Sequence, residues 1–320
     1  MKYKCLASVI LLLSGAPAFA GDVRLSGYGR FGLDSGYPNA FSPDQDPGLQ
    51  AGMASPNSTG ESLVDWSEPG FNLEFGSFLE YNAYTASNFS FAGIQADISY
   101  GVSMGNALWS FGANVIGQKL SNGNGFALVY PYASAQWGNS FVNLGYIAPA
   151  NAFITPNFSD GTFFYSYADD MLQSELGILA GTEINNRFLI VASLNQNQVA
   201  RLAGKARIND AYSVIGGAIV DLRRGGAYGF VGATADFERT RAQGLFTFYS
   251  GGFFAQAQID YLVTDRLTAT AYAQANQYSA SYFLSGTYRV LTDFGSGANV
   301  DLFAGFGSNK RVSAGVRVIY

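Results

Sequence analysis

Apolar and polar residues alternate along short stretches through most of the chain. Its end is the plainest case, where the apolar residues Val312, Ala314, Val316 and Val318 alternate with Ser313, Gly315 and Arg317 before a final aromatic residue, Tyr320. Side chains with a period of two project to opposite faces of a β-strand. Soluble domains commonly end in a frayed polar tail instead. The pattern therefore predicts a last strand with one apolar and one polar face, and an apolar C-terminal signature of Val316, Val318 and Tyr320.

The same alternation predicts sixteen strands in all. They cover residues 23–33, 71–84, 89–102, 107–119, 126–137, 141–147, 175–183, 187–197, 211–221, 227–238, 245–249, 253–263, 267–276, 282–291, 298–306 and 312–320. Tight turns such as Gly138-Asn139 join several of them. An alternative count of fourteen follows if 245–263 is one long bulged strand and 71–84 belongs to the first connection.

The polar faces of these strands indicate an aqueous interior. Arg24 and Arg30 share one face of the first strand, and two arginines pointing into a dry core would be very costly. Charged residues make up only 13% of the chain and aromatic residues 15%, whereas soluble domains carry about 25% charged residues. Apolar side chains facing lipid explain this composition. We therefore expect an all-β fold, a transmembrane antiparallel β-barrel, with a secreted β-sandwich or β-helix as the soluble alternative.

The first twenty residues have the pattern of a secretory signal. Lys2 and Lys4 precede the apolar stretch 6–13, and Ala18-Phe19-Ala20 matches a cleavage site. The stretch is too short to span a bilayer as a helix. We expect residues 1–20 to be removed and residues 21–320 to form one barrel domain in the bacterial outer membrane. The only cysteine, Cys5, leaves with the signal.

Charge narrows the partners further. Removal of the two leader lysines changes the formal net charge from −5 to −7. Such acidity argues against nucleic acid as a partner, because phosphate binding needs a basic surface. A barrel of this kind has outer-membrane lipid and small hydrophilic solutes and ions as its partners, and we expect no cofactor.

Two long segments interrupt the alternation. Residues 34–69 are rich in Pro, Gly, Ser, Asn and Asp and predict a long surface loop. Residues 148–172 mix Asp160, Asp169 and Asp170 with several aromatic residues. A segment of this length without regular structure is usually functional.

Three stretches resemble the general porins of Gram-negative outer membranes, in particular the alphaproteobacterial type. They are the first strand at 21–33, the hairpin at 133–145, and the last strands from 282–288 to 318–320. The resemblance implies a trimeric, water-filled barrel whose third loop folds inward and faces its carboxylates toward basic wall residues. By position, 148–172 would be this constriction loop and Asp160, Asp169 and Asp170 its acids.

The same resemblance implies a charged pore wall. Its candidates are Arg24, Arg30, Arg289 and Arg317. When the barrel closes, the first and last strands pair, and side-chain parity then places Arg30, Arg289 and Arg317 near Asp301. Excess acid in the lumen favours a mild cation preference. We expect no metal site, although loop carboxylates binding calcium remain an alternative.

Three other functions are weighed against a passive porin. Enzyme catalysis has little support, because the chain has no histidine and the mature chain no cysteine to act as base or nucleophile. A non-conducting barrel acting as an adhesin or structural anchor would use the long segment 34–69. A channel selective for sugars or organic acids would use Phe158, Phe163, Phe164 and Tyr165 as a stacking surface, unless these aromatic residues anchor the loop to the wall.

Overall fold

All strands in the described part of the chain belong to one sheet. The computed structural model describes residues 23–34, 63–64, 69–84, 88–120, 125–147, 150, 154, 175–294, 298–308 and 311–319. Its seventeen strands are β1 (Val23–Asp34), β2 (Gly70–Tyr84), β3 (Asn88–Met104), β4 (Ala107–Leu120), β5 (Gly125–Trp137), β6 (Ser140–Ile147), β7 (Glu175–Ile184), β8 (Phe188–Asn195), β9 (Val199–Arg207), β10 (Tyr212–Asp221), β11 (Gly226–Phe237), β12 (Thr240–Tyr249), β13 (Gly252–Thr264), β14 (Leu267–Asn276), β15 (Ala280–Phe294), β16 (Ala298–Gly307) and β17 (Arg311–Ile319).

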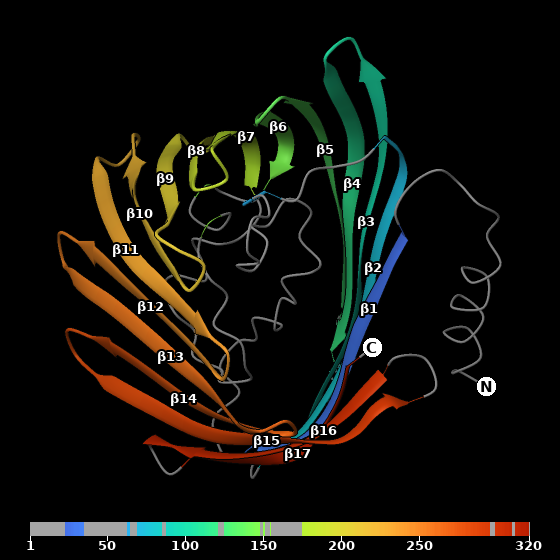
Figure 1. Ribbon diagram of the computed structural model, residues 1–320, viewed down its shortest axis with the longest axis vertical. Helices are drawn as coiled ribbons and strands as arrows, with labels where there is room; N and C mark the ends of the chain where they lie inside the picture. Colours follow the sequence, from blue (N-terminus) through green and yellow to red (C-terminus); the bar gives the residue numbers. More distant parts are fainter. Residues whose placement is uncertain are drawn as a thin grey trace.

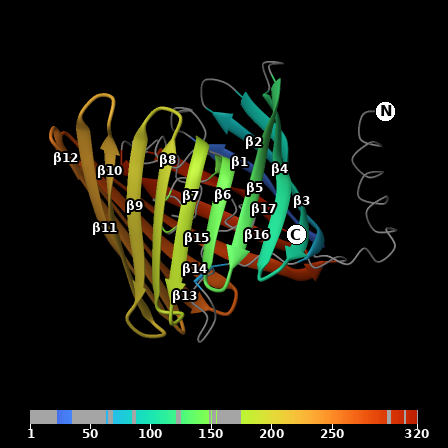
Figure 2. The ribbon, with the colours of Figure 1, turned by 90° about the horizontal axis from the view of Figure 1, so that it is seen from above.

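The strand pairings form a closed ring. From β2 to β17, each strand pairs antiparallel with the next, in a sixteen-stranded meander. β1 closes the ring, because it pairs antiparallel with β17 and parallel with β2. Figures 1 and 2 show the ring from two directions, with β1 between β2 and the last strands. Closure leaves no unpaired sheet edge. The expected all-β barrel is confirmed.

The sixteen expected strands are all present, and β9 is an additional one. Its sequence places Arg201, Lys205 and Arg207 among small residues, so it lacks the hydrophobic signal of a strand. β12 begins at Thr240, five residues earlier than expected. The alternative count of fourteen does not hold, since the turn Ser250-Gly251 separates β12 from β13 and β2 is a full strand.

The parallel pairing of β1 with β2 corrects two expectations, the count of sixteen strands and the surface loop at 34–69. An antiparallel ring with both chain ends on one side needs an even strand number, but one parallel pair permits an odd number. It also requires the chain to travel back along the barrel between Asp34 and Gly70. Leu63 and Val64, described residues of this connection, are 0% and 5% exposed. The segment 34–69 is therefore not a surface loop throughout.

Exposure alternates along the strands as expected for a barrel with a lipid-facing exterior. In β8, Phe188, Ile190 and Leu194 are exposed, whereas Leu189 and Val191 are buried. One end of the barrel holds the tight turns 138–139, 238–239 and 265–266 and is named the turn end here. Exposed aromatic residues recur near this end. They are Trp109, Trp137, Phe188, Tyr212, Phe237, Tyr261 and Tyr288. Such a girdle is typical of a membrane interface. Among the described residues, no helix is long and apolar enough to cross a membrane.

Candidate functional site in the barrel lumen

The inner wall carries an apolar cluster on one side of the barrel. Strands β6 to β12 contribute inward-facing residues to it, namely Phe141, Ile147, Leu179, Leu189, Val191, Ala203, Ile215, Ile219, Phe230 and Leu245. The cluster also contains Leu63 and Val64 from the first long connection and Ala150 and Ile154 from the third. Described residues of two long connections thus lie against the apolar residues of the lumen wall.

Hydrogen bonds hold both segments against the wall. The Leu63 amide donates to Glu183 Oε1 at 2.5 Å, and Glu183 is a buried residue of β7. The Ala150 amide donates to Ser193 Oγ of β8 at 3.0 Å. Ala150 and Ile154 are 0% and 2% exposed. The beginning of the third loop therefore folds inward, as expected, while Asp160, Asp169 and Asp170 lie outside the described residues.

A second feature of the inner wall is a charged cavity at the turn end. It has a volume of about 520 Å³ and lies between the turns of the β11–β12 and β13–β14 hairpins, extending to β15 and β16. Two ion pairs line it. Arg241 donates through Nη2 and Nε to Asp236 Oδ2, at 2.9 and 3.2 Å. Arg289 donates through Nε to Asp301 Oδ1 at 3.1 Å.

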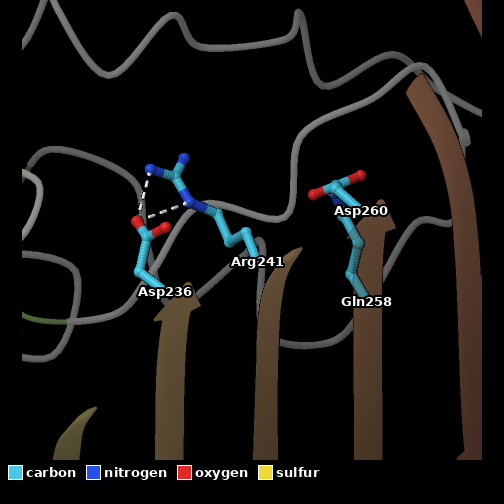
Figure 3. A network of polar contacts seen from close by, with 4 residues as sticks. All are labelled: Asp236, Arg241, Gln258 and Asp260. Carbon is cyan, nitrogen blue, oxygen red and sulfur yellow. Dashed lines mark hydrogen bonds and ion pairs between the residues drawn. The ribbon is translucent and has the colours of Figure 1, made fainter. Parts of the chain in front are cut away.

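Asp260 is a third strand carboxylate of this cavity, and neutral groups hold it. Gln258 Nε2 donates to its Oδ2 at 2.8 Å, and Thr270 Oγ1 donates to its Oδ1 at 2.6 Å. Figure 3 shows the guanidinium group of Arg241 turned toward Asp236, with Gln258 and Asp260 on the next strand. Further along the same wall, the Tyr272 hydroxyl lies 3.2 Å from the amide oxygens of Gln256 and Gln274. Amide and hydroxyl groups thus continue the polar lining away from the cavity.

The strand register brings four of the predicted wall residues into one row. Arg289 is opposite Asp301, Asp301 is opposite Arg317, and Arg317 is opposite Arg30. Within this row the structure describes the Arg289–Asp301 ion pair, and Asp301 is 1% exposed. The register thus places one aspartate and three arginines at neighbouring positions of four adjacent strands.

The remaining predicted residues are placed by the backbone alone. Arg24 is opposite Glu74 of β2 and lies on the same strand as Arg30, closer to the turn end. Val316 and Val318 are in β17, opposite Leu302 and Val300. Tyr320 lies outside the described residues. The role of these residues in a pore stays a prediction.

Sequence analysis missed several lumen residues. Arg241 was overlooked because the expected strand began four residues after it, although its position across the hairpin turn from Asp236 was a usable signal. Arg201 and Arg207 were overlooked with β9, and both are buried on its inward face. Glu183 lay in an expected strand, but nothing local indicated that it would bind the first connection. Three or more potential metal-ligating side chains do not gather in any part of the chain that the structure describes.

Comparison with solved structures gives the fold a name. An engineered protein described by its asymmetric conductivity matches with a TM-score of 0.53 and 14% identity, over 73% of this chain and 91% of that one. A variant of the Rhodopseudomonas blastica porin with two acidic residues replaced by alanine matches with a TM-score of 0.52 and 15% identity over the same shares. The chain has the porin fold. A further variant of that porin, with two basic residues replaced, matches at 16% identity. No family model and no curated protein sequence matches the chain.

Proposed function

We propose that this protein is an outer-membrane porin, a water-filled passage through which small hydrophilic solutes and ions diffuse. The observation that carries the proposal is the combination of the porin fold with a lumen wall of charged, amide and hydroxyl side chains. Apolar residues such as Val231, Ile259 and Leu302 cover the outside of the same strands. Water inside and lipid outside is the arrangement that this distribution stabilises.

The short connections favour a porin over an adhesin. At the barrel end opposite the turn end, strands are joined by 196–198, 222–225, 250–251 and 277–279. Such connections offer little surface for binding another cell or matrix protein. We also propose that the protein is not an enzyme, because the chain contains no histidine.

The two inserted segments define the expected width of the passage. Their described residues Leu63, Val64, Ala150 and Ile154 lie on the β6–β8 side of the lumen, so we expect solutes to move along the β11–β17 side, past the charged cavity. We therefore expect a smaller conductance than that of an unobstructed barrel of the same circumference.

Single-channel recording tests the proposal. The mature chain is refolded in detergent and added to a planar bilayer in potassium chloride, with heat-denatured protein as the control. Discrete conductance steps are expected. A folded, membrane-inserted protein that produces no steps contradicts the proposal and favours a non-conducting barrel.

Signal cleavage, location and assembly are further parts of the proposal. The leader at 1–20 and the porin fold support export to the outer membrane. The homotrimer rests on the resemblance of the sequence to general porins. A trimer mass from light scattering of the detergent complex, with closures in three equal steps, would support the homotrimer, whereas a monomer mass with single closures would contradict it.

The proposed cation preference is measured as the reversal potential across a salt gradient, and an anion preference would contradict it.

A further inference from the structure

Three charged residues form a row across β11, β12 and β13 at the turn end. Asp236 is directly opposite Arg241, and Arg241 is directly opposite Asp260. Arg241 thus stands between two carboxylates at equivalent positions. Both of its hydrogen bonds within the described structure go to a single oxygen of Asp236. Asp260 receives its hydrogen bonds from Gln258 and Thr270 instead.

Because Arg241 and Asp260 have different hydrogen-bond partners, both remain as charged groups in the lining of the cavity. The side chain of Arg241 is 53% exposed, so its guanidinium group is accessible to a solute. Asp260 is held in position by neutral donors, which orient a carboxylate without cancelling its charge. Each of its oxygens has accepted one hydrogen bond and can accept another. A fixed anion and an accessible cation therefore lie on adjacent strands, about 5 Å apart at the backbone.

We propose that this cavity binds zwitterionic solutes, amino acids and short peptides, with the ammonium group on Asp260 and the carboxylate on Arg241. The proposal rests on the proposed porin function and specifies a solute class for it. The cavity volume of about 520 Å³ is sufficient for such a solute, because small-molecule sites commonly measure about 300–1,000 Å³.

The balance of charge favours a zwitterion over a simple ion. Five carboxylates and four arginines line the cavity, the carboxylates being Asp236, Glu238, Asp260, Asp265 and Asp301 and the arginines Arg239, Arg241, Arg266 and Arg289. An ion of either sign is attracted by one set and repelled by the other. A solute that carries both charges a few ångströms apart can interact favourably with both sets, and an uncharged solute with neither.

Proteoliposome swelling tests this inference. Entry of L-glutamine, a zwitterion, is compared with entry of L-arabinose, an uncharged solute of similar size that does not cross lipid. Asp260→Asn is expected to lower the ratio of glutamine to arabinose entry about two- to fivefold, the effect of losing one partly exposed ion pair. Asp260→Glu keeps the carboxylate and should retain most of the ratio. Triglycine in place of glutamine extends the test to short peptides.

Asp210→Asn is the matched control. Asp210 is exposed in the turn between β9 and β10, at the same barrel end and away from the cavity. The substitution Asp210→Asn removes the same charge as Asp260→Asn and should leave the ratio of glutamine to arabinose entry unchanged. Equal effects of the two asparagine variants, or an equal loss of arabinose entry in Asp260→Asn, would overturn the inference. If Asp260→Asn does not fold, Arg241→Gln tests the other half of the site, with the same decrease expected and an unchanged ratio overturning it.

Conductance in potassium chloride separates the two proposals. Vesicles that conduct ions but show no dependence of the solute ratio on Asp260 or Arg241 contradict the zwitterion site alone. Folded protein without ion conductance contradicts the porin function. Binding of glutamine to the detergent-solubilised protein, followed by NMR line broadening, then decides whether the site exists without transport.

Discussion

At the scale of single residues, Glu183 links a distant part of the chain to the barrel wall. Its side chain is buried on the inward face of β7 and accepts a hydrogen bond from the Leu63 amide, 120 residues earlier in the chain. A carboxylate that accepts a backbone amide bond forms one of the stronger hydrogen bonds in proteins. Glu183 therefore contributes to stability through the segment it holds as well as through its own strand.

Replacement of this carboxylate should destabilise the barrel. We expect Glu183→Ala to lower the free energy of unfolding by about 1–3 kcal/mol, because a buried amide loses its acceptor. Glu183→Gln should cost less, since its amide oxygen can still accept. Denaturant unfolding in lipid vesicles measures the change. Glu238→Ala, in the exposed β11–β12 turn, is the control and should stay within about 0.5 kcal/mol; an equal loss in both variants would show that Glu183 has no special role.

At the scale of the strand, a glycine sets the close approach of β5 and β6. Gly145 of β6 lies opposite Tyr132 and has a φ of 108°, a conformation that residues with a side chain rarely adopt. A Cβ atom at this position would collide with the backbone of Pro131 and Tyr132. The pairing that leads into the third loop therefore depends on the absence of a side chain here.

The two kinds of strand glycine should respond differently to alanine. Gly145→Ala is expected to cost about 1–3 kcal/mol of unfolding free energy, through backbone strain. Gly286→Ala in β15 is the matched control, because an added Cβ meets nothing within 4 Å there. That control should be neutral or slightly stabilising, since it reduces the entropy of the unfolded chain. Equal unfolding curves for the two variants would contradict the assignment.

The two faces of a strand should also differ in their tolerance of charge. In β14, Ala271 is exposed on the outer face and Gln274 belongs to the inner face. We expect Ala271→Arg to cost about 2–4 kcal/mol in vesicles, because it places a cation in lipid. Gln274→Arg places the same charge in the aqueous lumen and should change the unfolding free energy by less than about 1 kcal/mol. A larger cost for the lumen variant would reverse the inside–outside assignment.

At the scale of the whole molecule, the ring of strands and the two returning segments form one structure. β1 closes the ring and is parallel to β2, and Leu63 and Val64, described residues of the connection between these two strands, belong to the apolar cluster in the lumen. The apolar wall of β6–β12 is thereby covered, and the open polar wall remains on the opposite side. The course of solutes through the barrel is a consequence of this connectivity.

A designed disulfide tests the seated third loop. The Ala150 amide lies 3.0 Å from Ser193 Oγ, which is compatible with the Cα separation of about 5.5–6 Å common in disulfides. In the mature chain, expected to lack cysteine, Ala150→Cys with Ser193→Cys should cross-link under oxidation, as seen by a mobility shift on a denaturing gel that reductant reverses. Conductance should stay unchanged, because the segment is already in place. Failure to cross-link, or a large fall in conductance on oxidation, would contradict the inward position.

The strands of the barrel wall could be predicted from the sequence more completely than the contacts inside the lumen. The β13–β14 hairpin was expected almost to the residue, since alternation of Ala with Gln and Thr is a local signal. The neighbourhood of Arg289, Asp301, Arg317 and Arg30 was also expected, because parity and closure suffice to derive it. β9 was missed because its inward arginines and lysine obscure the alternation. The contact of Leu63 with Glu183 could not be predicted, since no local pattern in the sequence relates these two residues.

The sequence by itself determined which side chains share a face of each recognised strand, and the arginines on the polar faces indicated that those faces meet water. That property is local, because successive residues of a strand point in opposite directions whatever the rest of the chain does. Only the tertiary structure decided the seventeenth strand, the parallel closure, the burial of Leu63, Val64, Ala150 and Ile154 on one side of the lumen, and the pairing of Arg241 with Asp236 and not with Asp260. These depend on which strands become neighbours around the ring, and residues that are remote in the chain compete there for the same space and the same partners.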